Sequence, residues 1–498
     1  MTINAETKDS LITESQRKRL IKQLSLIVSD ESLLCDDEQL RPYESDGLSV
    51  YRQKPLLVVL PETVEQVQAI LRVCYQQSVP VVARGAGTGL SGGALPLANG
   101  VLLGMAKFNQ ILDIDTERCL ARVQPGVRNL AISDAVAKHG LYYAPDPSSQ
   151  IACTIGGNVA ENSGGVHCLK YGLTVHNVQQ IKVVTMTGEL LTVGNLTLDG
   201  QGYDLLGLLN GSEGMLAVTV EVTVRLLPKP QFARLMMLAF DDVSKAGAMV
   251  AEVIAAGIIP GGMEMMDKLA VSAAEDFAQC GYPRDAEAVL LCELDGDELD
   301  VETQMQQVTT IAHECGATAV QIANNETERL LLWKGRKSAF PAVGRLSPDY
   351  YCMDGTIPRK HLAEVLQRTN ELSIEYGLQI ANVFHAGDGN LHPLILFDAN
   401  TPGELERAEE LGGRILELCV EYGGTITGEH GVGIEKINQM CSQFTAEELS
   451  QFHALKAAFD EHGLLNPGKA VPTLNRCADH GAMHVHKNKL AHPELERF

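Results

Sequence analysis

The sequence predicts an α+β protein with more than one domain, and two observations lead to this fold class. The first is the length of 498 residues, which exceeds what a single hydrophobic core usually accommodates. The second is the order of strand and helix patterns, which is interrupted at Pro228-Lys229-Pro230 and resumes beyond it in a different arrangement. Because two prolines within three residues interrupt any regular element, we expect two main domains that meet there.

The part of the chain before these prolines contains an α/β unit. Residues 14–28 predict an amphipathic helix, and residues 55–60 have the pattern of a short apolar strand. Pro61 then begins a predicted helix that extends to residue 77, and a strand over 79–83 leads into a glycine-rich loop. This order places the loop at the carboxyl end of a strand. Further strand patterns lie at 101–105, 119–124, 179–185 and 216–227.

The part after the prolines predicts a second domain, of the α+β class, followed by a C-terminal segment. We expect strands at 233–240, 289–295 and 379–397, and helices at 242–256, 301–315, 360–376, 405–422 and 446–459. The resulting division has four parts: an N-terminal helical segment (1–52) packing on the first domain, the first domain (53–230), the second domain (231–424) and a C-terminal segment (425–498).

Composition and charge exclude several classes of function. The formal net charge of −23 argues against nucleic-acid binding, because phosphates would be repelled over most of the surface. The richest apolar stretch, residues 246–263, is broken by Glu252 and Pro260, so we expect no membrane span. The first residues lack a basic region followed by an apolar run, which favours the cytoplasm over secretion.

The cysteines predict free thiols and no metal cluster. Twelve cysteines in a chain of this length are typical of buried thiols, not of a disulfide framework. No two of them have the C-x-x-C spacing of an iron–sulfur or zinc site. Any one-electron relay would therefore lie on another protein.

Residues 84–94 form a possible phosphate-binding loop with the sequence RGAGTGLSGGA. Glycines allow left-handed backbone angles, and their missing side chains let a diphosphate lie against main-chain N–H groups. Thr88 and Ser91 add hydroxyl donors, and Arg84 adds a positive charge. A mobile surface loop has a similar composition, so this loop alone does not establish a nucleotide site. No helix pattern begins inside the loop, so it is not a Rossmann fingerprint.

A second glycine-rich segment favours a long ligand. Residues 145–150 (PDPSSQ) lead into 154–165 (TIGGNVAENSGG), which again combines glycines with small hydroxyl and amide side chains. Tyr171-Gly172 and 211–214 (GSEG) follow. Several such segments within one domain suit an extended cofactor better than a mononucleotide.

Histidines near residue 390 form a possible metal site. Asp388-Gly389 is a strong signal for a two-residue hairpin turn, which would place His385 directly opposite His392 on one face. Two such imidazoles could bind one divalent metal ion, or they could simply be satisfied by hydrogen bonds beside a tight turn. Glu429-His430, within a loop bounded by glycines, adds a carboxylate and a third imidazole.

A basic cluster follows the only tryptophan of the sequence, in the order Trp333-Lys-Gly-Arg-Lys337. Arg336 could bind a carboxylate through two parallel hydrogen bonds, which a lysine cannot do. A short basic cluster is nevertheless more often a solvated face of a helix.

Together these segments resemble the vanillyl-alcohol oxidase and p-cresol methylhydroxylase (PCMH) superfamily, in particular its FAD-linked D-2-hydroxy-acid dehydrogenases. The resemblance extends from about residue 41 to residue 469. It implies that residues 53–230 are a two-part PCMH-type FAD-binding domain and that residues 231–424 are an α+β substrate (cap) domain. Residues 425–498 would then return to complete the active site and the FAD domain.

The resemblance also implies which residues bind the cofactor. These are Arg84, Gly85, Ala86, Gly87, Thr88, Gly89, Ser91, Gly92, Pro145, Ser148, Ser149, Gly156, Gly157, Asn158, Gly165, Tyr171, Glu213, Gly214, Asn466 and Lys469. Some members of the superfamily attach FAD covalently through a histidine in the first loop. Thr88 occupies that place here and cannot form the bond, so we expect FAD to be bound non-covalently.

The same resemblance assigns the reaction. His385, His392 and Glu429 would hold a divalent metal (zinc, iron or manganese), His430 would be the general base, and Arg336 would bind the substrate carboxylate. Cys352 and Leu394 replace polar residues of the 2-hydroxyglutarate branch. This favours a small 2-hydroxy acid such as glycolate or D-lactate, oxidised to the 2-oxo acid by hydride transfer to flavin N5.

Three functional hypotheses follow from the sequence. The first is a dehydrogenase that works with a second flavin-domain subunit and an iron–sulfur subunit, which pass electrons on and provide any association with the inner face of the cell membrane. The second is a stand-alone D-lactate or D-2-hydroxyglutarate dehydrogenase with a diffusible acceptor. The third is a flavin-binding subunit without turnover, which the intact set of His385, His392, Glu429 and His430 argues against.

Overall fold

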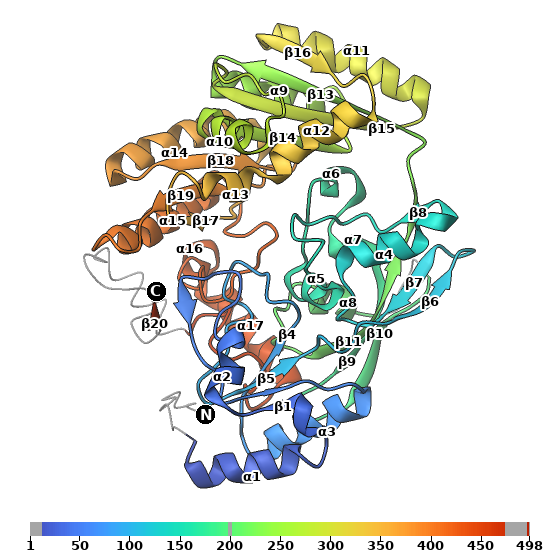
Figure 1. The fold of residues 1–498 in the computed structure, drawn as a ribbon, viewed down its shortest axis with the longest axis vertical. Coiled ribbons are helices and arrows are strands. Elements are labelled where there is room, and N and C mark those ends of the chain that lie inside the picture. The colour runs from blue at the N-terminus through green and yellow to red at the C-terminus, as the bar shows by residue number, and fades with distance from the viewer. Residues whose placement is uncertain (1–11, 198–201, 474–495, 498) are drawn as a thin grey trace.

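The computed structural model describes residues 12–197, 202–473 and 496–497, and it confirms the α+β class. Two lobes are visible in Figure 1, an upper lobe around one large sheet and a lower lobe around two smaller sheets. Parts of the N-terminal and C-terminal segments predicted from the sequence lie outside the described residues. In the described part of the chain, no helix combines the length and apolar character needed to cross a membrane.

The first sheet of the lower lobe contains the predicted α/β unit. Its strand order is β1 (Leu33–Leu34), β3 (Leu57–Val59), β5 (Val101–Gly104), β4 (Val81–Arg84), and both β3 and β4 run parallel to β5. Helix α3 (Val64–Gln76) joins β3 to β4 and packs against α1 (Glu14–Leu24). The predicted start at Pro61 was wrong: the Thr63 side chain accepts from the backbone N–H of Gln66, and this capping box begins α3 at Val64.

The second sheet of the lower lobe is antiparallel. Its strand order is β10 (Leu190–Gly194), β9 (Val178–Val184), β11 (Val218–Arg225), β7 (Leu120–Val123), β6 (Ile111–Asp115). Helices α4 (Asn129–Val136) and α5 (Ile155–Glu161) share a hydrophobic core with this sheet. Short strands β8 (Leu141–Tyr142) and β12 (Leu227–Pro228) pair beside it.

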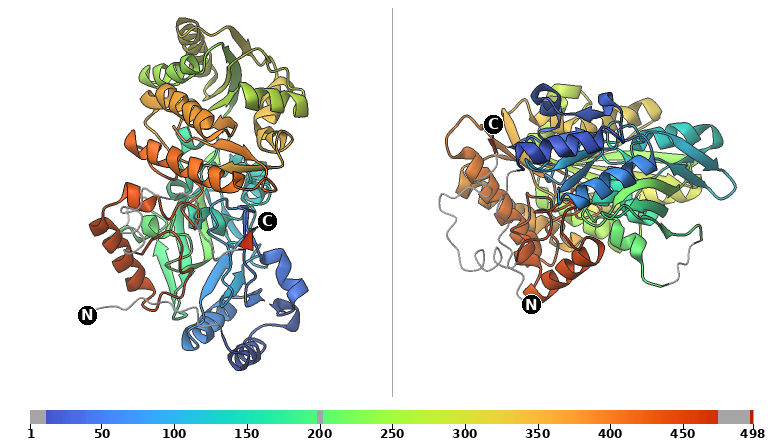
Figure 2. Two further views of the ribbon diagram at one scale, coloured as in Figure 1. Left: turned by 90° about the vertical axis from the view of Figure 1, so that its left-hand side faces the viewer. Right: turned by 90° about the horizontal axis from the view of Figure 1, so that it is seen from below.

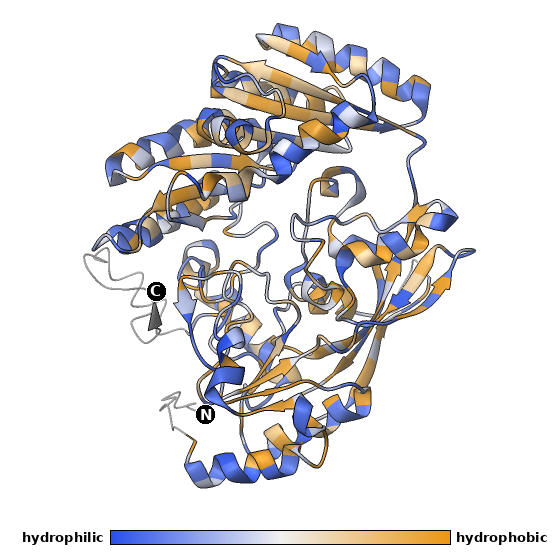
Figure 3. Ribbon diagram, viewed as in Figure 1, coloured by the Kyte–Doolittle hydropathy of each residue, from blue (hydrophilic) through white to orange (hydrophobic). Residues whose placement is uncertain are grey.

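The upper lobe is built on a seven-stranded antiparallel sheet. Its strand order is β16 (Ala319–Ile322), β13 (Phe232–Phe240), β15 (Ala288–Gly296), β14 (Gly262–Asp267), β18 (Ile380–Phe384), β19 (Pro393–Phe397), β17 (Asp349–Cys352). Helices α9 (Val243–Ala255), α11 (Glu298–Glu314) and α14 (Leu362–Tyr376) share one core with it. Helices α10 (Lys268–Ala278), α12 (Glu326–Lys337) and α13 (Ala339–Val343) share a second core with it. The central strands β13 and β15 are therefore apolar over most of their length, as Figure 3 shows.

The C-terminal part of the chain connects the two lobes. After α15 (Glu404–Glu421) and α16 (Met440–Gln443), the chain returns to the lower lobe, where α17 (Ala446–Phe459) lies (Figures 1 and 2). There Leu465 forms a parallel bridge with Val81, and Leu464 and Leu465 join the core of the first sheet. The remaining elements are short: α2 (Asp37–Leu40), α6 (Cys168–Tyr171), α7 (Thr174–Asn177), α8 (Leu205–Leu209), β2 (Tyr51–Arg52), β20 (Glu496–Arg497), and the 3-10 turns Asp30–Ser32, Arg41–Tyr43, Ala137–His139 and Arg359–His361.

The cysteines are mostly the free thiols that the sequence predicts. Ten cysteines of the described chain are free, whereas Cys441 is disulfide-bonded, so the expectation of free thiols fails at this position.

A polar network joins the two lobes. His167 of the lower lobe lies 2.8 Å from Asp146 and 3.4 Å from Glu293 on β15 of the upper lobe. The Glu293 carboxylate also accepts from the Trp333 indole and pairs with Arg329, both at 2.6 Å. Burial alone would raise the pKa of Glu293, but His167, Arg329 and Trp333 lower it to about 2.

Candidate active site

A cavity of about 410 Å³ lies where the glycine-rich segments of the lower lobe meet the upper lobe. Its wall combines residues 84–90, residues of 147–163, residues of 209–219, and residues of α12 and α13. His392, Glu429 and His430 also line it. Two sets of residues that the sequence singled out separately therefore share one pocket.

The first glycine-rich loop is shaped by close contacts that only glycine permits. Gly87 has a φ of +70°, and a Cβ atom there would lie 2.3 Å from the Arg84 guanidinium. A Cβ atom at Gly85 would lie 2.2 Å from the Thr154 hydroxyl. The Arg84 side chain turns away from the pocket and donates to the carbonyls of Tyr43 and Ser45. The loop thus presents its main chain to the pocket, and the hydrogen bonds of Arg84 fix the start of the loop.

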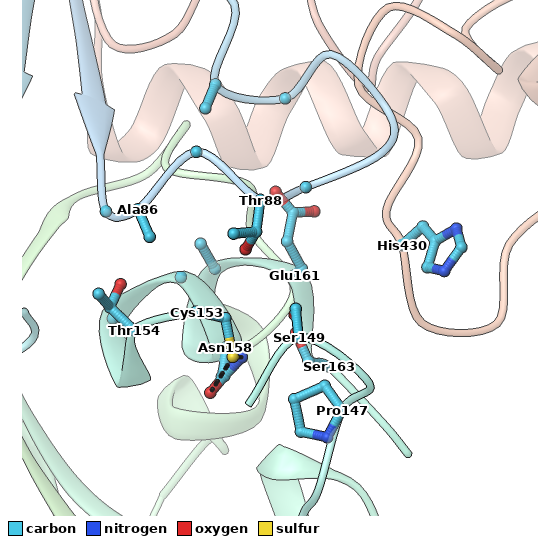
Figure 4. A pocket seen from close by; sticks show the side chains of 18 of the residues that line it. Ala86, Thr88, Pro147, Ser149, Cys153, Thr154, Asn158, Glu161, Ser163 and His430 are labelled. Carbon is cyan, nitrogen blue, oxygen red and sulfur yellow. Dashed lines mark hydrogen bonds between the residues drawn. The ribbon is translucent and has the colours of Figure 1, made fainter. Parts of the chain in front are cut away.

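The second glycine-rich segment begins a helix, which the sequence reading missed. Helix α5 starts at Ile155, and a Cβ atom at Gly156 would lie 2.6 Å from Pro125, so this turn of the helix packs tightly on the neighbouring loop. Asn158 is held by a hydrogen bond from Asn129 at 3.1 Å. Figure 4 shows Thr88, Glu161 and His430 among the side chains that line the pocket, with His430 on a separate loop.

The polar atoms of this pocket fit an FAD molecule. Thr154 Oγ1 and Glu161 Oε2 are buried and have no hydrogen-bond partner among the described residues, so a ligand with donors and acceptors would satisfy them. Burial, together with the neighbouring Glu213, raises the pKa of the Glu161 carboxyl well above its ordinary value. The sequence did not identify Glu161 as a site residue. An acidic residue inside a glycine-rich segment does not by itself indicate that its side chain lines a cavity.

The residues expected to bind the cofactor fall into two groups. One group lines the cavity: Arg84, Gly85, Ala86, Gly87, Thr88, Gly89, Ser148, Ser149, Gly156, Gly157, Asn158, Glu213 and Gly214. The other group does not line it: Ser91, Gly92, Pro145, Gly165, Tyr171, Asn466 and Lys469.

Several members of the second group support the cavity wall instead. Asn466 donates to the carbonyls of Gly93 and Glu213, and the Lys469 ammonium donates to the carbonyl of Gly93. The carbonyl of Ser91 accepts from two backbone N–H groups of the C-terminal segment. Tyr171 is directed elsewhere, because its hydroxyl donates to Asp295 of the upper lobe.

The predicted register of the histidine hairpin was wrong by two residues. His385 pairs with Asn390, and Asn382 pairs with Pro393, so residues 386–389 form a four-residue turn. Because side chains alternate between the faces of a strand, a shift of two keeps His385 and His392 on the same face. Their ring centroids lie 5.2 Å apart.

Both imidazoles direct their Nε2 atoms at one carboxylate oxygen. His385 Nε2 and His392 Nε2 lie 3.2 and 3.0 Å from Glu429 Oε1. His385 Nδ1 lies 2.7 Å from Glu264 Oε1, and His392 Nδ1 lies 3.3 Å from the carbonyl of Met353. These acceptors favour a proton on each Nδ1 and leave the Nε2 lone pairs free for a cation.

This donor set fits a divalent metal ion. Two imidazoles and one carboxylate offer ligand atoms within 4.8 Å of one another, a set that would leave coordination positions for a substrate. Cys352, His392 and His430 form a second such group. Because both groups contain His392, they are alternative ligand sets for one metal ion.

His430 is a neutral imidazole beside this set. Its ring stacks on that of His392 at a centroid distance of 4.8 Å, and its Nε2 lies 4.0 Å from Glu429 Oε1. Burial lowers the pKa of His430 to about 4; Asp354 opposes the shift, whereas His392 and Lys436 add to it. The His430 ring is therefore neutral near neutral pH and can accept a proton there.

Arg336 reaches the cavity from α12 and is held by Glu264. Its Nη2 lies 2.7 Å from Glu264 Oε2, and only 2% of the residue is exposed. Its Nε has no hydrogen-bond partner in the described chain, so the guanidinium retains donors for an anionic ligand. Lys337 also lines the cavity, whereas Leu394 is buried in the core beside Cys352 and does not.

Asp354 and Lys436 are two further residues that the sequence did not assign. Both are fully buried and form an ion pair at 3.0 Å beneath the loop that carries Glu429 and His430. Glu264, likewise fully buried, was missed as well. Charged residues within apolar strands and loops are the signal that could have identified them, because such residues are seldom buried without a partner.

Comparison with known families gives two matches that cover most of the chain. Residues 55–194 match the FAD binding domain, and residues 229–470 match the C-terminal domain of FAD linked oxidases. The first match ends before Pro228, and the second begins at Lys229, between the two prolines.

Curated relatives span nearly the whole sequence. The chain is 64% identical over 493 residues to the glycolate oxidase subunit GlcD of Escherichia coli (strain K12), covering 99% of both chains. It is 41% identical to the GlcD subunit of Bacillus subtilis (strain 168), over 86% of this chain and 91% of that protein. It is 35% identical to a D-lactate dehydrogenase of Archaeoglobus fulgidus, over 84% of this chain and 92% of that protein.

Solved structures show the same fold at low identity. p-Cresol methylhydroxylase with substrate bound has a TM-score of 0.78 at 17% identity, covering 93% of this chain and 98% of that one. An alkyldihydroxyacetonephosphate synthase has a TM-score of 0.72 at 18% identity, covering 91% of this chain and 86% of that one. The PCMH-type architecture expected from the sequence is confirmed.

Proposed function

Because this chain belongs to the family of FAD-linked oxidases that includes the glycolate oxidase subunit GlcD, we propose that it oxidises a small 2-hydroxy acid. The proposed substrate is glycolate or D-lactate, and the product is the corresponding 2-oxo acid. The observation that carries this proposal is a single cavity lined by the glycine-rich loops, by Arg336, and by His392, Glu429 and His430.

The proposed cofactors divide the chemistry. Bound FAD supplies a hydride acceptor at flavin N5, and a divalent cation (zinc, iron or manganese) held by His385, His392 and Glu429 supplies a Lewis acid for the substrate hydroxyl. Thr88 lies in the cavity wall where some superfamily members have a histidine, which supports non-covalent FAD. The cofactor residues outside the cavity wall are proposed to hold its loops in place.

The residues of the chain then act on the substrate in fixed roles. Arg336 binds the substrate carboxylate through the donors that Glu264 leaves free. His430 accepts the hydroxyl proton at Nε2, the ring nitrogen 4.0 Å from Glu429 Oε1. As the proton leaves the oxygen, the C2 hydrogen leaves with two electrons as hydride, and the C–O bond becomes a carbonyl.

The division of the chain and its partners complete the proposal. We infer that residues 53–230 bind FAD and that residues 231–424 cover the substrate. Within the described chain, the part of 1–52 packs on the FAD domain, and the part of 425–498 completes the active site and the FAD domain. The relatives in Escherichia coli and Bacillus subtilis bear the name of a subunit, which supports a multi-subunit complex. No C-x-x-C pair is present in the sequence, so the iron–sulfur relay is assigned to a partner, together with any membrane association.

Anaerobic mixing with glycolate or D-lactate tests this function. The flavin absorbance of the holoenzyme should bleach with at least one of these acids. His430→Ala should retain its flavin and lower the reduction rate by about 10²–10⁴-fold, because general-base catalysis has this magnitude. Failure of every 2-hydroxy acid to bleach the flavin would reject the enzyme, and loss of flavin from His430→Ala would reject the role of that residue.

A further inference from the structure

The loop that carries Glu429 and His430 is held by two buried carboxylates from different lobes. Asp354 follows β17 of the upper lobe, and Glu213 precedes β11 of the lower lobe. Neither residue belongs to the loop, and their exposed fractions are 0% and 6%. Both carboxylates accept hydrogen bonds from the backbone of the loop, but they bind different residues of it.

Asp354 binds the first half of the loop. Its carboxylate accepts from the backbone N–H groups of Gly428, Glu429 and His430 at 3.0, 3.2 and 2.9 Å. It also accepts from the hydroxyl of Thr427 at 2.7 Å. The Lys436 ammonium pairs with the same oxygen at 3.0 Å, and this charge offsets the cost of burying the carboxylate.

Glu213 binds the second half of the loop. Its two oxygens accept from the N–H groups of Val432 and Gly433, both at 2.7 Å. Between the two halves, the carbonyl of Gly431 accepts from Lys436 and from Thr427, at 3.0 Å in each case. The backbone from 428 to 433 is thus bonded at every residue.

Glycines allow this close approach. Gly431 has a φ of +81°, and a Cβ atom there would lie 2.0 Å from Glu161 Oε2. A Cβ atom at Gly433 would lie 2.1 Å from the carbonyl of Ser91, which belongs to the first glycine-rich loop. The loop is therefore pressed against both lobes and against the cofactor wall.

We propose that Asp354 and Glu213 are positioning residues that together fix Glu429 and His430 in the active site. This inference rests on the proposed function for the roles of those two side chains. Because the carboxylates come from different lobes, the geometry of the site depends on how the FAD domain and the cap domain dock. Charge-assisted hydrogen bonds to the backbone are strong and directional, so they can set the loop to a fraction of an ångström.

Conservative variants test this clamp, the pair of carboxylates of Asp354 and Glu213, against a matched control. Glu213→Gln and Asp354→Asn keep the size of each side chain and remove its charge. Glu275→Gln is the control, because Glu275 also accepts three backbone N–H groups, those of Cys280, Gly281 and Tyr282, but lies outside the cavity wall. Hydrogen exchange, bound flavin, zinc affinity and the rate of flavin reduction are measured for each protein.

The clamp predicts a specific pattern. Glu213→Gln and Asp354→Asn should exchange faster at residues 428–433 and lose about 10–100-fold in zinc affinity and in kcat, as for other residues that orient metal ligands. Asp354→Asn, whose residue does not line the cavity, should also retain flavin. KM should change little, because Arg336 is not on the loop. Glu275→Gln should exchange faster only near residues 280–282 and keep wild-type zinc affinity and kcat.

Two results would overturn the clamp. One is unchanged exchange at 428–433 in both variants, and the other is faster exchange with wild-type zinc affinity and kcat. If the wild-type flavin is not reduced by any 2-hydroxy acid, the proposed function fails by itself. The exchange and zinc comparisons would still decide the clamp in that case, because neither depends on turnover.

Discussion

At the scale of single residues, Glu264 connects two functions that the sequence treated separately. One of its oxygens lies 2.7 Å from His385 Nδ1 and the other lies 2.7 Å from Arg336 Nη2. The proposed metal ligand and the proposed carboxylate-binding residue are therefore fixed relative to one another by one buried side chain. A 2-hydroxy acid carries its hydroxyl and carboxylate on adjacent carbons, so this spacing suits such a substrate.

The variant Glu264→Gln should impair both functions together. A neutral amide no longer stabilises the Nδ1 proton of His385, and it leaves Arg336 without its counter-charge. We expect zinc affinity to fall by about 10–100-fold, the range for residues that orient metal ligands, and KM for the 2-hydroxy acid to rise. Equilibrium competition with a chromophoric chelator and steady-state kinetics measure these effects. Glu252→Gln, at an exposed position on α9, is the control. An unchanged zinc affinity in Glu264→Gln would contradict the role of Glu264 in orienting His385.

At the scale of elements, the first glycine-rich loop shows how local sequence specifies a binding surface. Gly87→Ala should lower FAD affinity by at least about tenfold, because the Cβ atom would displace Arg84 and the loop with it. Gly140→Ala is a matched control: it has a similar φ of +68° but no atom within 4 Å of the added Cβ. Both variants should lose stability through the strained φ, and Gly87→Ala should lose more because its Cβ also clashes with Arg84, whereas flavin fluorescence titration should detect weaker binding only for Gly87→Ala. Equal FAD affinity in the two variants would contradict this account.

The elements also show how much the sequence could predict. Helices with clear apolar periodicity, such as α9 and α14, were predicted within three residues at each end. β14 and α10 were missed, because β14 is buried on both faces between two other strands and α10 is rich in alanine, so neither alternates clearly between apolar and polar side chains. The prediction of the hairpin register was wrong because Asp388-Gly389 favours a two-residue turn, whereas His385 pairs with Asn390 and the turn has four residues.

The site residues divide in a similar way. Motifs in the sequence pointed to the residues that are proposed to carry the chemistry, since glycine-rich and histidine-rich segments are unusual in composition. Asp354, Lys436 and Glu264 act through contacts between distant segments, and a single sequence does not record which distant segments meet. Their positions therefore required the tertiary structure.

At the scale of the whole molecule, the docking of the lobes should depend on pH through Glu293. Its pKa is lowered to about 2 from an ordinary value of 4.5, so its contribution to stability is present above about pH 4.5 and is lost as the pH falls towards 2. Between pH 6 and pH 3 the loss is about 2 kcal/mol, at about 1.4 kcal/mol for each pKa unit. Glu293→Gln should be less stable at pH 6, and its stability should fall by about 2 kcal/mol less over this interval.

Urea unfolding of the flavin-free protein at the two pH values measures this difference. Asp242→Asn, which removes the charge of an exposed helix cap on the upper lobe, should keep the wild-type pH dependence over the interval. An identical pH dependence in wild type and Glu293→Gln would show that this carboxylate does not contribute to docking.

The indole at the junction of the lobes also gives the protein an internal optical reporter. Trp333 is the only tryptophan of the sequence, and its N–H group donates to Glu293 at the network that joins the two lobes. Its emission therefore comes from one known position, so no dye or engineered label is needed. Because flavins absorb where indoles emit, quenching of this signal would follow the arrival of FAD, and a shift in its wavelength would follow separation of the lobes.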